Sequence, residues 1–94
     1  MYIRAVRFTD ATAEQFDRTV ARVQEAGGPP PGVKTTGLQL LLDAEQGTAF
    51  ALQLFDTVED MREADQVFAA MDQADTPGTR ASVDMCEVKL DLRA

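Results

Sequence analysis

Residues 37–56 read GLQLLLDAEQGTAFALQLFD and decide how the rest of the chain is arranged. Two apolar runs, residues 33–43 and 48–56, flank the four residues AEQG, and Gly47 suits a left-handed turn position. Runs of this length with a short polar connection are typical of paired strands. The pattern predicts an antiparallel β-hairpin.

The hairpin has two faces, because successive side chains of a strand point to opposite sides. We expect two apolar triplets to form the side that helices cover: Leu38, Leu40, Leu42 and Phe50, Leu52, Leu54. The opposite side would then carry semi-apolar residues with scattered polar groups: Gly37, Gln39, Leu41, Ala49, Ala51, Gln53 and Phe55. Such a side is an exposed apolar patch in a monomer.

Each end of the hairpin is flanked by one helix and one further strand. Residues 2–8 are short, β-branched and aromatic, which predicts a strand. Thr12 with Gln15 fits a capping box for a helix over residues 13–26, which the following glycines and prolines end. Asp56 or Thr57 is expected to cap a second helix that runs to about residue 75, and the alternation over residues 81–92 predicts a last strand.

The resulting order, β-α-β-β-α-β, is that of an α+β ferredoxin-like fold, in which two helices cover one face of a four-stranded antiparallel sheet. The length of 94 residues allows one domain, residues 1–94, with a small core. The semi-apolar open face is best covered by a second copy. We therefore expect a homodimer that packs sheet to sheet as a dimeric α+β barrel, with a cavity or packed side chains between the sheets.

The composition excludes several classes of function. The formal net charge is −7, and the sequence pI of about 4.3 argues against nucleic acid as a partner. A single cysteine cannot close an internal disulfide, and neither a signal peptide nor a membrane span is recognisable, so we expect a cytoplasmic protein. The bias toward arginine over lysine is typical of a GC-rich bacterial genome.

Metal binding and cysteine catalysis both lack the residues that they need. The chain has no histidine and one cysteine, which removes the usual transition-metal ligands. We interpret the acidic residues at helix ends as solvated or capping groups, with a weak Mg²⁺ or Ca²⁺ contact as the alternative: Asp56, Glu59, Asp60, Asp72 and Asp75. Cys86 is expected to be a small buried apolar residue, because no histidine can activate its thiol.

Three segments resemble a known family: MYIRAVRF at residues 1–8, GLQLLLDAEQGTAFALQLFDTVEDM at 37–61, and SVDMCEVKL at 82–90. They are similar to small dimeric α+β-barrel proteins related to the antibiotic-biosynthesis monooxygenases. The resemblance implies a homodimer, a pocket between sheet and helices or inside the barrel, and, in some relatives, oxygenation of aromatic polyketide-like substrates without a cofactor. Two positions depart from the family: Phe55 stands where the family often has tryptophan, and Cys86 replaces an aromatic residue near the middle of the last strand. Haem-dependent relatives rely on histidine, tryptophan and asparagine, none of which occurs here.

Arg4 is the charge most informative about a site, because it lies in the middle of a strand that this topology places at the centre of the sheet. Either it pairs with a carboxylate such as Asp84 or Glu87, or it faces the cavity. In the second case it would form a polar and aromatic pocket for an anionic or phenolic ligand with Tyr2, Gln39, Gln53 and Phe55.

From the sequence we expect a protein that binds a small aromatic or anionic ligand in its barrel cavity, with no cofactor, no metal and no defined catalytic site. The alternative is a cofactor-independent monooxygenase for an aromatic polyketide-like substrate, in which Tyr2 could donate a proton to an oxyanion. This alternative needs no histidine, asparagine or tryptophan, since an activated phenolate can react with oxygen through positioning.

Overall fold

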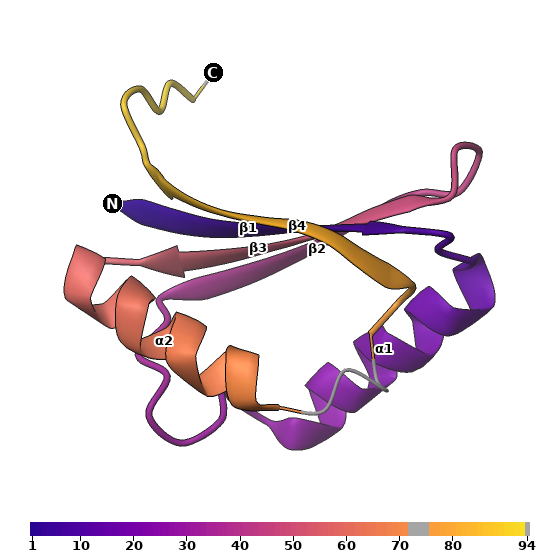
Figure 1. Cartoon of the computed structure of the whole chain (residues 1–94), viewed down its shortest axis with the longest axis horizontal. Coiled ribbons are helices and arrows are strands. Elements are labelled where there is room, and N and C mark those ends of the chain that lie inside the picture. Colours follow the sequence, from indigo (N-terminus) through magenta and orange to yellow (C-terminus); the bar gives the residue numbers. More distant parts are fainter. Residues whose placement is uncertain (72–75, 94) are drawn as a thin grey trace.

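Six elements follow one another in the order β-α-β-β-α-β, which confirms the α+β ferredoxin-like fold (Figure 1). The computed structural model describes residues 1–71 and 76–93. The elements are β1 (Tyr2–Thr9), α1 (Ala13–Ala26), β2 (Gly37–Asp43), β3 (Thr48–Phe55), α2 (Val58–Ala70) and β4 (Thr79–Glu87).

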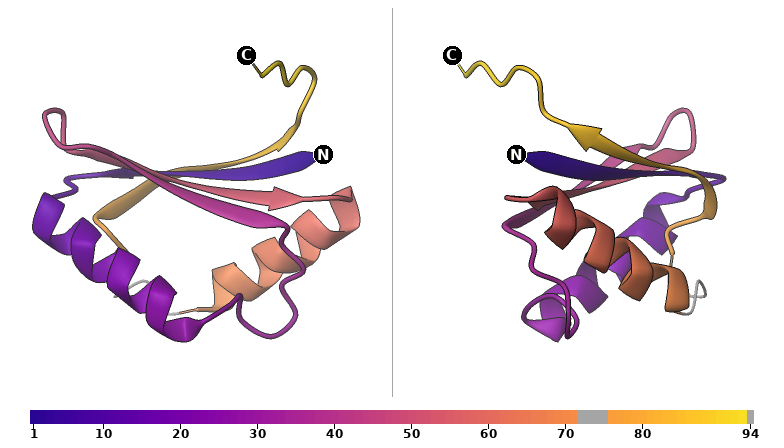
Figure 2. Two further views of the ribbon diagram at one scale, coloured as in Figure 1. Left: turned by 180° about the vertical axis from the view of Figure 1, so that it is seen from behind. Right: turned by 60° about the vertical axis from the view of Figure 1, so that its left-hand side comes forward.

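The four strands form one sheet in the order β2-β3-β1-β4, and all three neighbouring pairs are antiparallel. The central position of β1, expected from the topology, is confirmed. Both helices lie on the same side of the sheet (Figure 2). Each helix starts close to one end of the sheet and runs away from it, so that the two helices form a V beneath the strands.

The caps of both helices follow the local sequence. The Thr12 side chain accepts a hydrogen bond of 3.2 Å from the backbone of Gln15, and α1 ends at Gly27, whose φ of 70° is left-handed. Thr57 accepts a 3.1 Å hydrogen bond from the backbone of Asp60 at the start of α2. Helix α2 ends at Ala70, earlier than expected. No helix within residues 1–71 and 76–93 is long and apolar enough to cross a membrane.

Two strands are shorter than the sequence pattern predicts. Val33 precedes β2 and is instead buried in a core cluster, while the strand begins at Gly37. Strand β4 ends at Glu87, although the alternation of apolar residues continues to Leu92. Leu90 and Leu92 are 74% and 83% exposed, so this alternation does not reflect burial within the chain.

The register of the hairpin corrects the expected assignment of faces in β3. Asp43 pairs with Thr48 across the turn, and Leu40 pairs with Ala51. Directly paired residues of antiparallel strands share a face, so the leucine triplet of β2 lies on the helix side together with Ala49, Ala51, Gln53 and Phe55. The expectation that Phe50, Leu52 and Leu54 face the helices is wrong: they lie on the open face of the sheet.

The core consists of two clusters at opposite ends of the sheet, each between the strands and the first half of one helix. The cluster between the sheet and α1 contains Val6, Phe8, Ala11, Phe16 and Ala49. The cluster between the sheet and α2 contains Val33, Phe55, Met61 and Ala64, with Tyr2 packed against them. Because the helices diverge from the sheet toward their C-terminal ends, the region between the two clusters is left less filled.

Candidate functional site

A pocket of about 860 Å³ lies in this region, between the C-terminal halves of the two helices and the sheet. One wall is the second half of α1, and the opposite wall is the end of α2. The loop that joins α1 to β2 closes one side, and Leu38 and Gln53 contribute the sheet side. The pocket therefore combines residues from three separate parts of the chain: residues 19–38, Gln53 of β3, and Phe68 and Met71 at the end of α2.

The lining of the pocket is mainly apolar. Its apolar side chains are Val23, Ala26, Pro29, Pro30, Pro31, Val33, Leu38, Phe68 and Met71. Its polar side chains are Thr19, Arg22, Thr35, Thr36 and Gln53. A concave apolar surface with a few polar groups is the usual composition of a site for a small organic molecule.

Arg4 lies next to the pocket and is held by three neighbours. It is 2% exposed. Its Nε donates to Asp65 Oδ1 at 2.9 Å, and its Nη1 donates to Gln53 Oε1 at 3.0 Å. The guanidinium lies 5.1 Å from the centroid of the Phe68 ring, a cation–π distance. The ion pair and these contacts compensate for the burial of the charge.

The partner of Arg4 differs from the two carboxylates expected from the sequence. Arg4 does pair with a carboxylate, but the carboxylate is Asp65 of α2, not Asp84 or Glu87. Asp84 pairs with Ala5 in the sheet, so it lies on the opposite face. Glu87 instead forms an ion pair of 2.7 Å with Lys89. Arg4 faces the helices, and α2 brings Asp65 over it.

The structure brings together part of the predicted set of site residues. Gln53 contacts Arg4 and lines the pocket. Tyr2 and Phe55 share their side of the sheet but pack in the core cluster beneath α2, where Phe55 is 0% exposed. Phe55 therefore does not face a partner sheet, contrary to the expected assignment. Gln39 lies on the open face, away from the pocket.

Two components of the site were not recognised from the sequence: Asp65 and the loop over residues 28–36. The signal for Asp65 was present, because it follows Met61 by four residues and precedes Phe68 by three. These spacings place it on the apolar side of α2, where a carboxylate needs a buried cation. The loop carried no comparable signal, because its position depends on how the helices diverge.

The remaining candidates are not gathered into a site. Within residues 1–71 and 76–93, no cluster of acidic or cysteine side chains is placed to hold a metal ion. Asp72 and Asp75 lie outside the described residues. Cys86 is exposed, so the expectation that it is buried is wrong. The reason is its place on the open face of an edge strand, which no other part of the described chain covers.

The geometry suits recognition of a ligand more than proton transfer. Among the described residues that line the pocket there is no carboxylate, thiol or phenol. Hydrogen bonds to a bound molecule can come from an amide, hydroxyl groups and a guanidinium.

A comparison with models of known protein families finds no match for this chain, and a comparison with curated proteins finds no match either.

Proposed function

We propose that this protein binds a small, largely apolar organic molecule, of aromatic character, in the pocket between its helices and its sheet. The observation that carries the proposal is the pocket itself: about 860 Å³, lined by apolar side chains, with polar groups at a few positions. This volume is within the range of sites that take drug-sized molecules. The site differs from the cavity between two sheets expected from the sequence.

Aromatic character of the ligand is supported by the shape and chemistry of the walls. Phe68 offers a ring, and three consecutive prolines offer stiff apolar surface. Arg22 also lines the pocket and would attract an anionic substituent on the ligand. We propose binding without catalysis, because the described lining has no carboxylate, thiol or phenol. The proton donor and acceptor of a monooxygenase reaction would have to be the substrate itself or groups outside this lining.

Two leucines of β2 provide a matched test. Leu38 lines the pocket and is 41% exposed, whereas Leu41, on the open face of the same strand, is 43% exposed. A fluorescence titration with 8-anilino-1-naphthalenesulfonate, an aromatic anion, measures binding. Leu38→Trp fills the pocket and is expected to weaken binding at least about tenfold, and Leu41→Trp should leave it within about twofold.

The reverse order of effects would place the probe on the open face and overturn the pocket as the binding site. Equal binding by both variants would overturn it as well. Circular dichroism on both variants checks that each is folded. Both positions are part-exposed, so the larger side chain has room.

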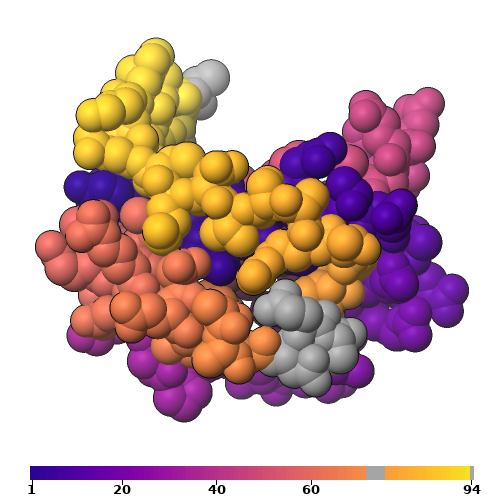
Figure 3. Space-filling view, in the orientation of Figure 1, coloured from indigo at the N-terminus to yellow at the C-terminus, as the bar shows by residue number. Residues whose placement is uncertain are grey.

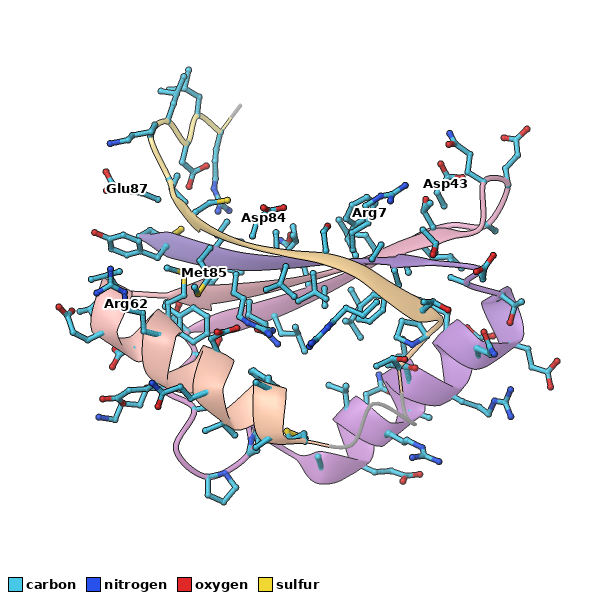
Figure 4. All side chains as sticks on the ribbon, viewed as in Figure 1. Arg7, Asp43, Arg62, Asp84, Met85 and Glu87 are labelled. Carbon is cyan, nitrogen blue, oxygen red and sulfur yellow. The ribbon has the colours of Figure 1, made fainter. Side chains whose placement is uncertain are left out.

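We also propose that the open face is covered by a second copy of this chain. The face is apolar over three strands, with Ile3, Ala5, Leu41, Phe50, Leu52 and Leu54. It also carries Arg7 and Asp84, which lie on the side away from the helices (Figure 4). Within the described residues neither of them forms an ion pair.

Charge complementarity supports a second copy as the occupant. A two-fold interface places the same face against itself, so Arg7 can meet the partner's Asp84 twice. In Figure 3 the β2–β3 hairpin and the C-terminal segment rise on either side of the sheet, so the face between them is hollowed. Light scattering at micromolar concentration is expected to give the mass of a dimer, and a stable monomer would overturn this proposal.

A further inference from the structure

The side-chain amide of Gln53 has a fixed orientation. Arg4 carries only hydrogen-bond donors, so the Gln53 atom 3.0 Å from its Nη1 must be the carbonyl oxygen Oε1. Arg4 is itself held by Asp65 and is almost fully buried. A flip of the Gln53 amide would place two donors against each other, which is costly at a buried position. Arg4 therefore acts as a positioning residue for this amide.

The other end of the same amide remains available. Gln53 Nε2 takes part in no hydrogen bond within the described residues. Every buried side-chain nitrogen or oxygen of these residues has a partner, so Nε2 must reach accessible space. The accessible space next to Gln53 is the pocket that it lines. Gln53 thus offers the pocket an N–H donor with a set direction, strengthened by the hydrogen bond to a cation at the other end of the amide.

We infer that the pocket selects ligands that present a hydrogen-bond acceptor, such as a carbonyl oxygen, to Gln53, and discriminates against ligands that present a donor there. This inference rests on the proposed binding function and adds the polarity of the ligand to it. An acceptor completes the hydrogen bonding of Nε2 inside an apolar site. A donor leaves both its own N–H and that of Gln53 unpaired, which is unfavourable away from water.

Three planar molecules of nearly the same size separate the effect of a hydrogen-bond acceptor on the ligand from the effect of a donor. Fluorene has neither donor nor acceptor, 9-fluorenone has a carbonyl acceptor, and carbazole has an N–H donor. Displacement of 8-anilino-1-naphthalenesulfonate measures the affinity of each for the unmodified protein. We expect 9-fluorenone to bind about tenfold more tightly than carbazole.

Gln53→Glu is the decisive variant. The glutamate has the same length, keeps an acceptor for Arg4 and adds an ion pair, so the fold is retained. It presents an oxygen to the pocket where Gln53 presents Nε2. The preference is expected to invert, so that carbazole binds more tightly than 9-fluorenone and the ratio of the two affinities changes at least about tenfold. Fluorene, which does not use this position, should change by less than about threefold.

The possible failures are distinguishable. An unchanged ratio of 9-fluorenone to carbazole affinity in Gln53→Glu overturns the inference about Gln53 and leaves the proposed binding function intact. Failure of all three molecules to bind the unmodified protein overturns the proposed function itself. A variant that loses fluorene binding together with the other two also contradicts the inference, because the effect of Gln53 would then be general and not directed at hydrogen bonding.

Discussion

The two faces of the sheet differ in a way that residue size alone does not explain. On the helix side, β3 presents the small residues Ala49 and Ala51, and β1 presents the cation Arg4. On the open side, β3 presents the large residues Phe50 and Leu52, which the described chain leaves partly exposed. At this point of β3 the small residue Ala49 is fully buried, whereas its larger neighbour Phe50 is partly exposed.

The comparison teaches that burial is set by what covers a strand. On the helix side, Leu40, Phe8 and Phe16 fill the space above the alanines. The charge of Arg4 is tolerated there because Asp65 and Gln53 satisfy it. On the open side the larger residues have no such cover within the described chain. Large apolar residues without cover are the observation that supports the proposed dimer.

Substitution of one phenylalanine on each face gives the largest expected contrast. Phe55→Ala removes a fully buried ring and is expected to lower the free energy of unfolding by about 3–5 kcal/mol. Phe50→Ala, on the open face, should cost less than half as much under conditions that keep the chain monomeric. Urea denaturation followed by circular dichroism measures both. Equal losses would mean that the two faces are equally buried and would break the comparison.

The two faces are also expected to differ in the effect of removing a carboxylate. Asp65→Ala leaves Arg4 buried without its counter-ion, and we expect a loss of about 1–3 kcal/mol in the free energy of unfolding. Asp84→Ala, on the open face, is the matched control and should stay within about 0.5 kcal/mol in the monomer. Thermal unfolding at low protein concentration measures both. If Asp65→Ala left the free energy of unfolding unchanged, the contacts with Gln53 and Phe68 would be enough to stabilise the buried charge of Arg4.

A charge exchange on the open face tests how that face is covered. In the proposed dimer, Arg7→Glu places like charges against the partner's Asp84 and is expected to weaken association about tenfold. The double variant Arg7→Glu with Asp84→Arg restores the opposite charges and should recover most of the affinity. Analytical ultracentrifugation measures the dimer constant. Failure of the double variant to recover would place another contact opposite Arg7.

Cys86→Ser has the smallest expected effect. The thiol is exposed on an edge strand, so the free energy of unfolding of the monomer should change by less than about 0.5 kcal/mol. A buried apolar cysteine would lose more, because its replacement would bury a hydroxyl group. Urea denaturation of the variant beside the unmodified protein decides between the two. A loss above 1 kcal/mol would show that this end of the open face is covered.

Local signals in the sequence were sufficient for the order of the elements and for both helix starts. Thr12 and Thr57 cap the helices as their spacing predicts, and Gly27 ends α1. The faces of β3 were predictable too, although they were assigned wrongly. A four-residue connection that pairs Asp43 with Thr48 places even-numbered residues of β2 opposite odd-numbered residues of β3. Hydrophobicity, which favoured grouping the large residues, was the wrong guide.

The candidate site was only partly accessible from the sequence. The sequence predicts Arg4 and Gln53 as neighbours in a site, and they do lie in contact. Tyr2 and Phe55, expected to give the pocket its aromatic rings, pack in the core instead. The pocket depends on the angle at which the helices leave the sheet. That angle results from packing at the helix starts, and residue spacing does not contain it.

The sequence by itself determined the fold class, because the period of apolar residues, the caps and the turn are properties of short segments. It also determined that a carboxylate or a ligand had to compensate the charge of Arg4 at the centre of the sheet. Only the tertiary structure decided which carboxylate does so, since Asp65 is 61 residues away and reaches Arg4 through the path of α2. The pocket and the direction of the Gln53 amide were decided in the same way, by contacts between segments that no local pattern connects.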